Sequence, residues 1–130
     1  MPSKKRKFGD VGEEFAKDYL LSKGYAIVLC NYQKPWGEID IIAEKAGIIR
    51  FIEVKTSRFY PESSFTPEIR VNKKKIRSLK RICETYLLEQ KLPPDREWQI
   101  DVISVILNDD DTLREINHIE NAVFERPYWP

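Results

Sequence analysis

The sequence predicts an α/β fold in which a mixed β-sheet is flanked by helices. Segments with a helical apolar period alternate with β-rich apolar segments, in the order helix, three strands, helix, two strands. Two of the strand segments are separated only by a short turn, which is typical of a β-hairpin. The chain has 130 residues, and no repeat or linker divides it. This length and this pattern together indicate one domain.

The first helix is predicted over residues 9–23, where apolar side chains recur at helical spacing and Gly24 follows as a stop. Residues 25–32 are β-rich and predict a buried strand. Residues 37–44 and 47–55 predict the two strands of the hairpin. The apolar positions of the helix are Val11, Phe15, Tyr19 and Leu20.

The second half of the chain follows the same logic. Residues 56–70 contain two prolines and small polar residues, so they predict a loop. A longer helix is predicted over residues 71–91, and the prolines that follow end it. Residues 97–107 predict a fourth strand, and residues 113–124 contain a short last strand. The apolar stripe of the second helix is Ile76, Leu79, Ile82, Cys83, Tyr86 and Leu87.

The composition excludes several classes of protein. Hydrophobic residues make up 42% of the chain, which is enough for a packed core. No apolar run approaches the ~18 residues of a membrane span. Two isolated cysteines and a single histidine, His118, support neither a disulfide framework nor a His/Cys zinc site. We expect a soluble cytoplasmic protein, with a flexible basic tail over residues 1–8, one domain over 9–125 and a C-terminal tail over 126–130.

The charge is unevenly distributed along the chain. Residues 1–81 hold 18 Lys and Arg against 10 Asp and Glu, whereas residues 82–130 hold 4 against 11. Residues 70–81 alone contain seven basic side chains and no acid. Such a surface favours contact with phosphate backbones, and the alternative is an ordinary solvated face. The candidate nucleic-acid contacts in the helix are Lys73, Lys74, Arg77, Lys80 and Arg81.

The hairpin predicts a cation site. If its loop has two or four residues, Asp40 lies directly opposite Glu53, and like charges there are destabilising. A bound Mg²⁺ or Mn²⁺ would offset this repulsion, because these ions take carboxylate and water ligands. Lys55 lies on the same strand face as Glu53 and could stabilise charge on a phosphate undergoing attack. The alternative is a plain ion pair of Lys55 with Glu38 or Glu53.

A third carboxylate comes from the first helix. At ~100° per residue, Glu13 falls at the edge of the apolar side, whereas Glu14 falls on the solvent side. Glu13 can therefore face the hairpin. The alternative is that both are ordinary first-turn residues that favour a helix N-terminus.

Several stretches resemble a known family. The segments "GDVGEEFAKDYLLSKGY", "LCNYQKPWGEIDIIA", "FIEVKTSR" and "INHIENAVF" together resemble the YraN family of endonuclease-like proteins, of the PD-(D/E)XK superfamily. The resemblance implies a restriction-endonuclease-like αβββαβ core, similar to archaeal Holliday junction resolvases. It implies Asp40 and Glu53 as metal ligands together with the carbonyl of Val54. The catalytic set that it implies is Glu13, Asp40, Glu53 and Lys55.

Two departures from the family pattern accompany this resemblance. Ile39 precedes Asp40 where the motif has proline, and the basic residue after the strand motif is Arg58, one place late. Arg58 remains a candidate nucleic-acid contact. Asp101 is expected to support the site or to pair with Arg96 or a lysine, and His118 to be a structural histidine.

Three functions are compatible with these residues. The first is an Mg²⁺-dependent endonuclease acting on DNA, including branched DNA. The second is a non-catalytic nucleic-acid-binding module that keeps the fold. The third is a dimeric interaction protein whose charges pair internally. The complete set of Asp40, Glu53 and Lys55 favours the first, and a homodimer is considered for each.

Overall fold

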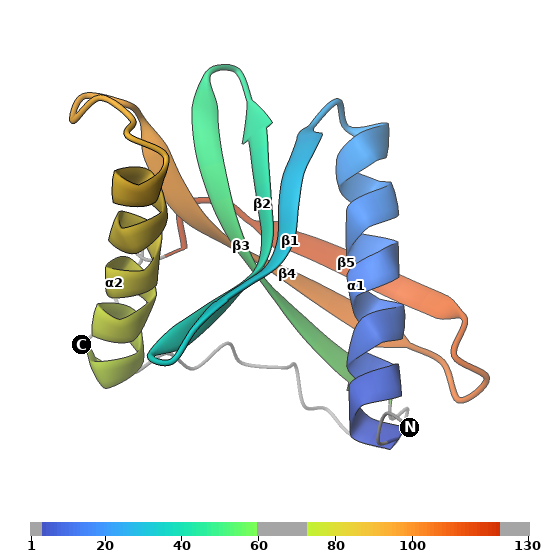
Figure 1. Ribbon diagram of the computed structural model, residues 1–130. Helices are drawn as coiled ribbons and strands as arrows, with labels where there is room; N and C mark the ends of the chain where they lie inside the picture. Colours follow the sequence, from blue (N-terminus) through green and yellow to red (C-terminus); the bar gives the residue numbers. More distant parts are fainter. Residues whose placement is uncertain (1–3, 60–72, 123–130) are drawn as a thin grey trace.

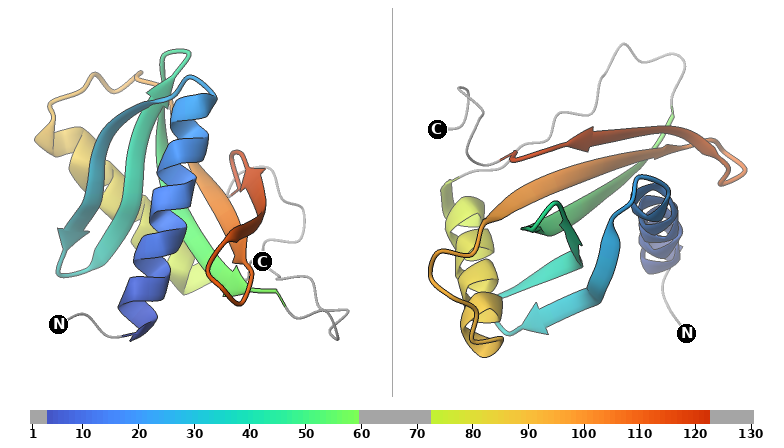
Figure 2. Two further views of the ribbon diagram at one scale, coloured as in Figure 1. Left: turned by 90° about the vertical axis from the view of Figure 1, so that its right-hand side faces the viewer. Right: turned by 90° about the horizontal axis from the view of Figure 1, so that it is seen from above.

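The part of the chain that the structure describes forms a five-stranded sheet with a helix on each face. The computed structural model describes residues 4–59 and 73–122, and the side chains of residues 4–6 and 73–75 are outside the description. Figures 1 and 2 show α1 and α2 on opposite faces of the sheet. The elements are α1 (Lys4–Ser22), β1 (Ala26–Lys34), β2 (Gly37–Lys45), β3 (Ile48–Arg58), α2 (Lys73–Glu89), β4 (Trp98–Leu107) and β5 (Leu113–Ile119). This order confirms the predicted α/β class and is consistent with a restriction-endonuclease-like core.

The sheet is mixed, with strand order β1-β2-β3-β4-β5. Among the described strands, β3 and β4 are the pair that runs in parallel, and α2 lies between them in the chain and covers one face. The predicted hairpin of β2 and β3 has a two-residue turn, in which Ala46 and Gly47 have φ of 55° and 75°. Positive φ at both central residues is the requirement of a type I′ turn. The register that we predicted for this hairpin is confirmed by the pairing of Lys45 with Ile48 and of Ile41 with Ile52.

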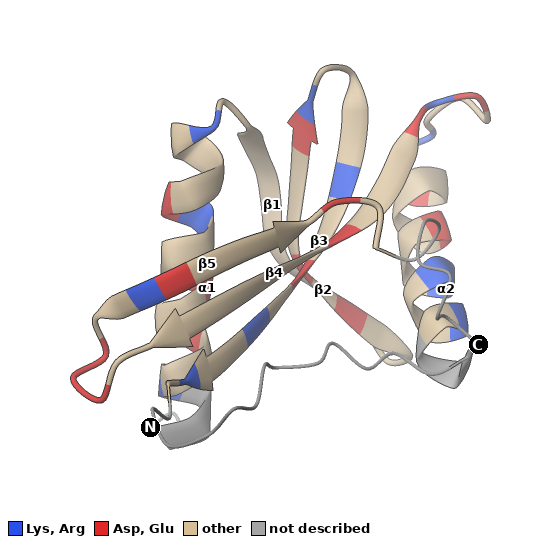
Figure 3. Ribbon diagram, turned by 180° about the vertical axis from the view of Figure 1, so that it is seen from behind, with Lys and Arg blue, Asp and Glu red and all other residues tan. Residues whose placement is uncertain are grey.

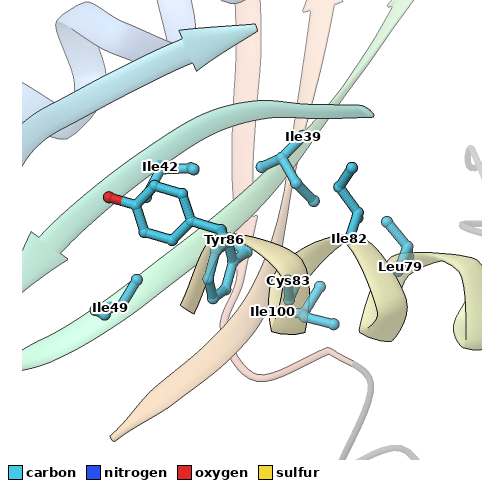
Figure 4. Close-up of a cluster of buried hydrophobic side chains, with 9 residues drawn as sticks. Ile39, Ile42, Ile49, Leu79, Ile82, Cys83, Tyr86 and Ile100 are labelled. Atoms are coloured by element: carbon cyan, nitrogen blue, oxygen red, sulfur yellow. The ribbon is translucent and has the colours of Figure 1, made fainter. Parts of the chain in front are cut away.

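Two apolar clusters hold the helices to the sheet. On one face, Leu79, Ile82, Cys83 and Tyr86 of α2 pack on strand residues that include Ile39, Ile42 and Ile100 (Figure 4). On the other face, Ala16 and Leu20 of α1 pack on residues that include Ile41 and Ile52. These contacts confirm the apolar stripe that we predicted for α2 and place both helices firmly against the sheet.

Four features of the elements differ from the sequence predictions. Helix α1 begins at Lys4 instead of residue 9, so part of the expected basic tail is helical. Strand β1 lies at the sheet edge, and Val28 and Leu29 are 46% and 41% exposed, so it is not the buried strand we predicted. Strand β3 continues to Arg58, into the expected loop, whose residues 60–70 are outside the described ranges. Helix α2 ends at Glu89, two residues before the predicted end, whereas the predicted first residues 71 and 72 lie outside the described ranges.

In the described ranges, neither helix is long and apolar enough to cross a bilayer.

Candidate active site at the strand fork

The candidate site lies where β2 separates from β3. Backbone pairing of these strands ends at Ile41 and Ile52, and β2 then leaves toward α2 (Figure 1). Ile41 belongs to the apolar cluster under α1, whereas Ile39 belongs to the cluster under α2, so the strand twists sharply between them. Asp40 lies at this twist, and its Oδ2 accepts a hydrogen bond from the backbone N–H of Val54 at 2.7 Å. We call this place the fork.

The predicted opposition of Asp40 and Glu53 is only partly correct. They occupy the next positions of the confirmed register, but the strands have already diverged and do not pair there. Glu53 is still close enough for its charge to help raise the pKa of Asp40. Glu38 pairs with Gln33 on β1, and the pairing of β2 with β3 ends at Ile41 and Ile52, so no strand pairing sets Glu38 opposite Lys55.

Helix α1 brings Glu13 to Asp40, as its helical phase predicted. The two carboxyl groups lie within hydrogen-bonding reach of each other, so each affects the proton affinity of the other. Burial, followed by the charge of Asp40, raises the pKa of Glu13 from 4.5 to about 7. Burial also raises the pKa of Asp40, against the opposing effect of the Val54 N–H. The fork therefore concentrates negative charge in a partly desolvated place.

This arrangement predicts a pH-dependent stability in the absence of divalent cations. Because its pKa is raised, Glu13 binds its proton more tightly in the folded chain, so the free energy of unfolding falls as pH rises from 4.5 to about 7. The acids that face it are Asp40, Glu38 and Asp10. We expect Glu13→Gln to remove this fall and to be more stable than the unsubstituted protein above pH 7 by about 1 kcal/mol, because water screens this half-buried group.

Urea unfolding at pH 4.5 and pH 8 with EDTA measures this difference. Glu14→Gln is the matched control, since Glu14 is exposed and pairs with Lys17 on the same helix. An equal pH dependence in the Glu13→Gln variant and the unsubstituted protein would contradict the prediction.

A glycine permits the close approach of α1 to β3. Gly12 is buried, and a Cβ built on it would lie 2.8 Å from Cβ and Cγ2 of Thr56 and closer still to its Oγ1. Real Cβ atoms essentially never approach so closely. Only glycine therefore fits at this crossing, and its neighbour Glu13 reaches the fork because the helix lies this near.

Glu53 and Lys55 form an ion pair on one face of β3. Lys55 Nζ lies 3.0 Å from Glu53 Oε1, and the side chains are 42% and 17% exposed respectively. This is the ion pair that we considered as the plain alternative. It also leaves the ammonium group beside the fork and accessible to solvent, as a catalytic role would require.

The candidate nucleic-acid contacts fall into two groups. Arg58 is bound within the fold, because it pairs with Asp111 at 2.7 Å, donates to the carbonyl of Asn108 and lies over the ring of Phe8. On α2, Arg77 and Arg81 are exposed and Lys80 is half-buried. The guanidinium of Arg81 lies over the ring of Trp36, which packs against the apolar cluster under α2. The side chains of Lys73 and Lys74 are outside the described residues.

Both helices begin with basic residues, contrary to the usual preference of a helix dipole. The first turns are Lys4–Lys7 in α1 and Lys73–Ile76 in α2, and neither contains an acid. Cations at a helix N-terminus are unfavourable by a few tenths to 1 kcal/mol each. The two helices start at the same end of the molecule, toward which β2 and β3 diverge (Figure 1). Along α2, basic residues precede acidic ones (Figure 3).

Comparison with known proteins identifies the family. The family model described as "Uncharacterised protein family UPF0102" matches residues 12–105. A UPF0102 protein of Alkaliphilus oremlandii is 42% identical over 90% of this chain and 97% of its own length. The corresponding values for a relative from Thermodesulfovibrio yellowstonii are 40%, 89% and 95%. The chain belongs to the UPF0102 family. The matched segment of this UPF0102 protein runs from Gly12 to Val105 on β4 and includes the fork.

The UPF0102 fold also contains a polar network that the sequence did not predict. Asp101 is fully buried, and among its partners are His118 at 2.8 Å and Arg50 at 3.7 Å. Arg50 also pairs with Glu120 at 2.7 Å, whereas Arg96, the expected partner of Asp101, pairs with Glu44. No local spacing indicates this network, because its members come from three strands and the segment after β5. Both ring nitrogens of His118 are engaged, as expected for a structural histidine.

Proposed function

We propose that this UPF0102 protein is a metal-dependent endonuclease that hydrolyses phosphodiester bonds in DNA. The observation that carries the proposal is the meeting of Glu13 and Asp40 at the fork, with Glu53 and Lys55 on the adjoining strand. Three carboxylates and one ammonium on three elements supply the groups that phosphodiester hydrolysis requires. The resemblance of these four positions to the PD-(D/E)XK set supports the same reaction.

The atoms at the fork suit Mg²⁺ or Mn²⁺. The carboxylates of Asp40 and Glu53 and the carbonyl of Val54 would be the ligands, and all three offer oxygen atoms, which these hard cations prefer. Burial and the charges of Glu38 and Glu53 raise the pKa of Asp40, and the charge of Asp40 helps to raise the pKa of Glu13, so a cation would relieve repulsion between these carboxylates. When bound, the ion supplies Lewis-acid chemistry at the phosphate and lowers the pKa of a bound water.

The side chains of this protein would fill the other catalytic roles. Lys55, held beside Glu53, would orient the attacking water and stabilise the charge that develops on the phosphate oxygens. Glu13, within hydrogen-bonding reach of Asp40, would receive a proton from that water. Gly12 would keep Glu13 at this position by letting α1 lie against Thr56.

Contact with the nucleic acid would come from basic groups at the same end of the molecule. The lysine-rich starts of α1 and α2 combine side-chain charge with the positive ends of two helix dipoles. Exposed Arg77 and Arg81 extend this surface along α2. Contacts of this kind address phosphates and not base edges, so they favour recognition of DNA structure, including branched DNA, over recognition of sequence.

Cleavage of a labelled panel tests the proposal. Duplex, single-stranded, flap and four-way-junction substrates are incubated with Mg²⁺, Mn²⁺ or EDTA, and the products are resolved on denaturing gels. We expect metal-dependent cutting, reduced about 100-fold by Lys55→Gln with binding retained. Lys91→Gln is the matched control, because it removes the same charge from an exposed site at the end of α2.

The other outcomes assign the alternative functions. Salt-sensitive binding without cutting in any metal would indicate a non-catalytic nucleic-acid-binding module. Absence of binding at low salt would reject both nucleic-acid functions and favour an interaction protein.

A further inference from the structure

A second polar site lies away from the fork, at the other end of β3. It is a hollow of about 230 Å³ between the end of α1, the β2–β3 turn and the end of β5. Arg50, which lines it, precedes Lys55 by five residues, so the two are roughly 16 Å apart along the strand. The volume is below the ~300–1,000 Å³ of pockets for drug-sized ligands, and it suits a small chemical group.

Two lysines flank the mouth of this hollow. Lys45 Nζ donates to the backbone carbonyl of Lys23 at 2.7 Å and lies 4.8 Å from the ring centre of Tyr25. Lys23 Nζ lies 5.9 Å from the ring centre of Tyr19. An ammonium group has three N–H donors, and the contact with the carbonyl uses one of those of Lys45. Both ammonium groups are thus held near the hollow with donors to spare.

Arg50 provides a buried donor at the same place. Its side chain is 8% exposed, and one terminal nitrogen pairs with Glu120 at 2.7 Å. Its Nε is buried and has no hydrogen-bond partner among the described residues. A buried unpaired donor in a native structure usually indicates an acceptor such as water or an anion oxygen. Arg50 therefore brings to the hollow that it lines a guanidinium with an unused donor, an observation independent of the lysines.

The charge balance of the hollow favours an anion. Three cations, Lys23, Lys45 and Arg50, line it against one acid, Glu120. That acid is paired with Arg50 and accepts a hydrogen bond from Tyr25. A metal ion is disfavoured although Asp101, His118 and Glu120 form a compact set of ligand types, since Arg50 already pairs with both acids.

We infer that this hollow binds a phosphate group through Lys23, Lys45 and Arg50. Ammonium and guanidinium groups form strong charge-assisted hydrogen bonds with phosphate oxygens. The phosphate could belong to a nucleic acid or to a small phosphorylated molecule, because the recognising chemistry is the same. The inference does not depend on cleavage at the fork, so either proposal can be rejected while the other stands.

Titration of the ¹⁵N-labelled protein with inorganic phosphate, followed by NMR at constant ionic strength, tests the inference. We expect saturable shifts of the amide signals of Lys23, Ala46 and Arg50. We expect Lys23→Gln/Lys45→Gln to weaken binding about tenfold or more, since it removes two charged donors from exposed positions and should leave the fold intact. Lys91→Gln, which removes an exposed charge at the end of α2, is expected to change the dissociation constant by less than about twofold.

Shifts of equal size with chloride, absence of saturation, or equal binding by the double variant would each overturn the inference. A second titration uses a short single-stranded oligonucleotide with and without a 5′-phosphate. Competition with inorganic phosphate by both forms would assign the site to the nucleic-acid backbone, and competition by the phosphorylated form alone to a terminal phosphate. Competition by neither, with phosphate itself still bound, would assign it to a small phosphorylated molecule.

Discussion

Asp40→Asn is expected to abolish metal-dependent cleavage, with a loss of at least about a thousandfold in rate. Asp40 is the carboxylate at the centre of the fork, where it accepts a hydrogen bond from the Val54 N–H and lies within hydrogen-bonding reach of Glu13. Asparagine keeps nearly the same shape and can still accept from that N–H, but it loses the charge that would hold a divalent cation. The rate is measured on whichever substrate of the panel the unsubstituted protein cuts best.

The same substitution should stabilise the metal-free protein. Burial and the charges of Glu38 and Glu53 raise the pKa of Asp40, so its ionised form is disfavoured in the folded chain. Removal of the charge relieves that repulsion, and thermal unfolding in EDTA should occur at an equal or higher temperature. With millimolar Mn²⁺, the unsubstituted protein should gain stability from binding, whereas the variant should gain little.

Glu38→Gln separates a specific effect from a change of charge. It removes one negative charge from the same strand, but Glu38 is exposed and is not among the proposed metal ligands. We expect it to keep most of the cleavage and the Mn²⁺-induced stabilisation. Cleavage by Asp40→Asn at the rate of Glu38→Gln would contradict the assignment of Asp40 and with it the proposed function.

The elements that bring the fork together were predictable because their patterns are local. The type I′ turn at Ala46 and Gly47 sets the hairpin register, and that register places Asp40 and Glu53 on neighbouring strands. The helical phase of α1 placed Glu13 toward the hairpin, and the structure brings it to Asp40. Short-range geometry of this kind is carried by the spacing of a few residues.

What escaped prediction depends on neighbours distant in the chain. The twist at Asp40 follows from the packing of Ile39 and Ile41 under different helices, and no residue type in the strand indicates it. Strand β1 contains the apolar run of a buried strand, yet its place at the sheet edge leaves Val28 and Leu29 partly exposed. The lysine-rich start of α1 violates the usual preference for acids at a helix N-terminus. Such violations are expected at functional surfaces.

Gly12→Ala should have the second large effect, on both stability and cleavage. The added methyl would overlap Thr56 on β3, so α1 must move away from the sheet. Overpacking of this kind costs about 1–3 kcal/mol in the free energy of unfolding. The shift would also carry Glu13 away from Asp40, and a displacement near 1 Å can reduce a rate about 100-fold. Urea unfolding and the cleavage assay measure the two effects on the same preparation.

Gly9→Ala is the matched control on the same helix. A Cβ at Gly9 would meet nothing within 4 Å, so alanine there should stabilise the helix by roughly 0.5–1 kcal/mol and leave cleavage unchanged. Changes of opposite sign in the free energy of unfolding at two glycines three residues apart would exclude a general effect of helix propensity. Destabilisation of equal size at both positions would contradict the proposed contact.

Thr56→Gly then tests whether the clash itself is the cause. The glycine removes all three Thr56 atoms that the methyl would overlap, so it should be less harmful in the Gly12→Ala background than alone. A coupling energy of about 1 kcal/mol or more in this double-mutant cycle would establish direct contact between α1 and β3 at this point. If stability and cleavage recover together, the position of α1 controls Glu13. If stability recovers without cleavage, the Thr56 side chain has a separate role beside Lys55.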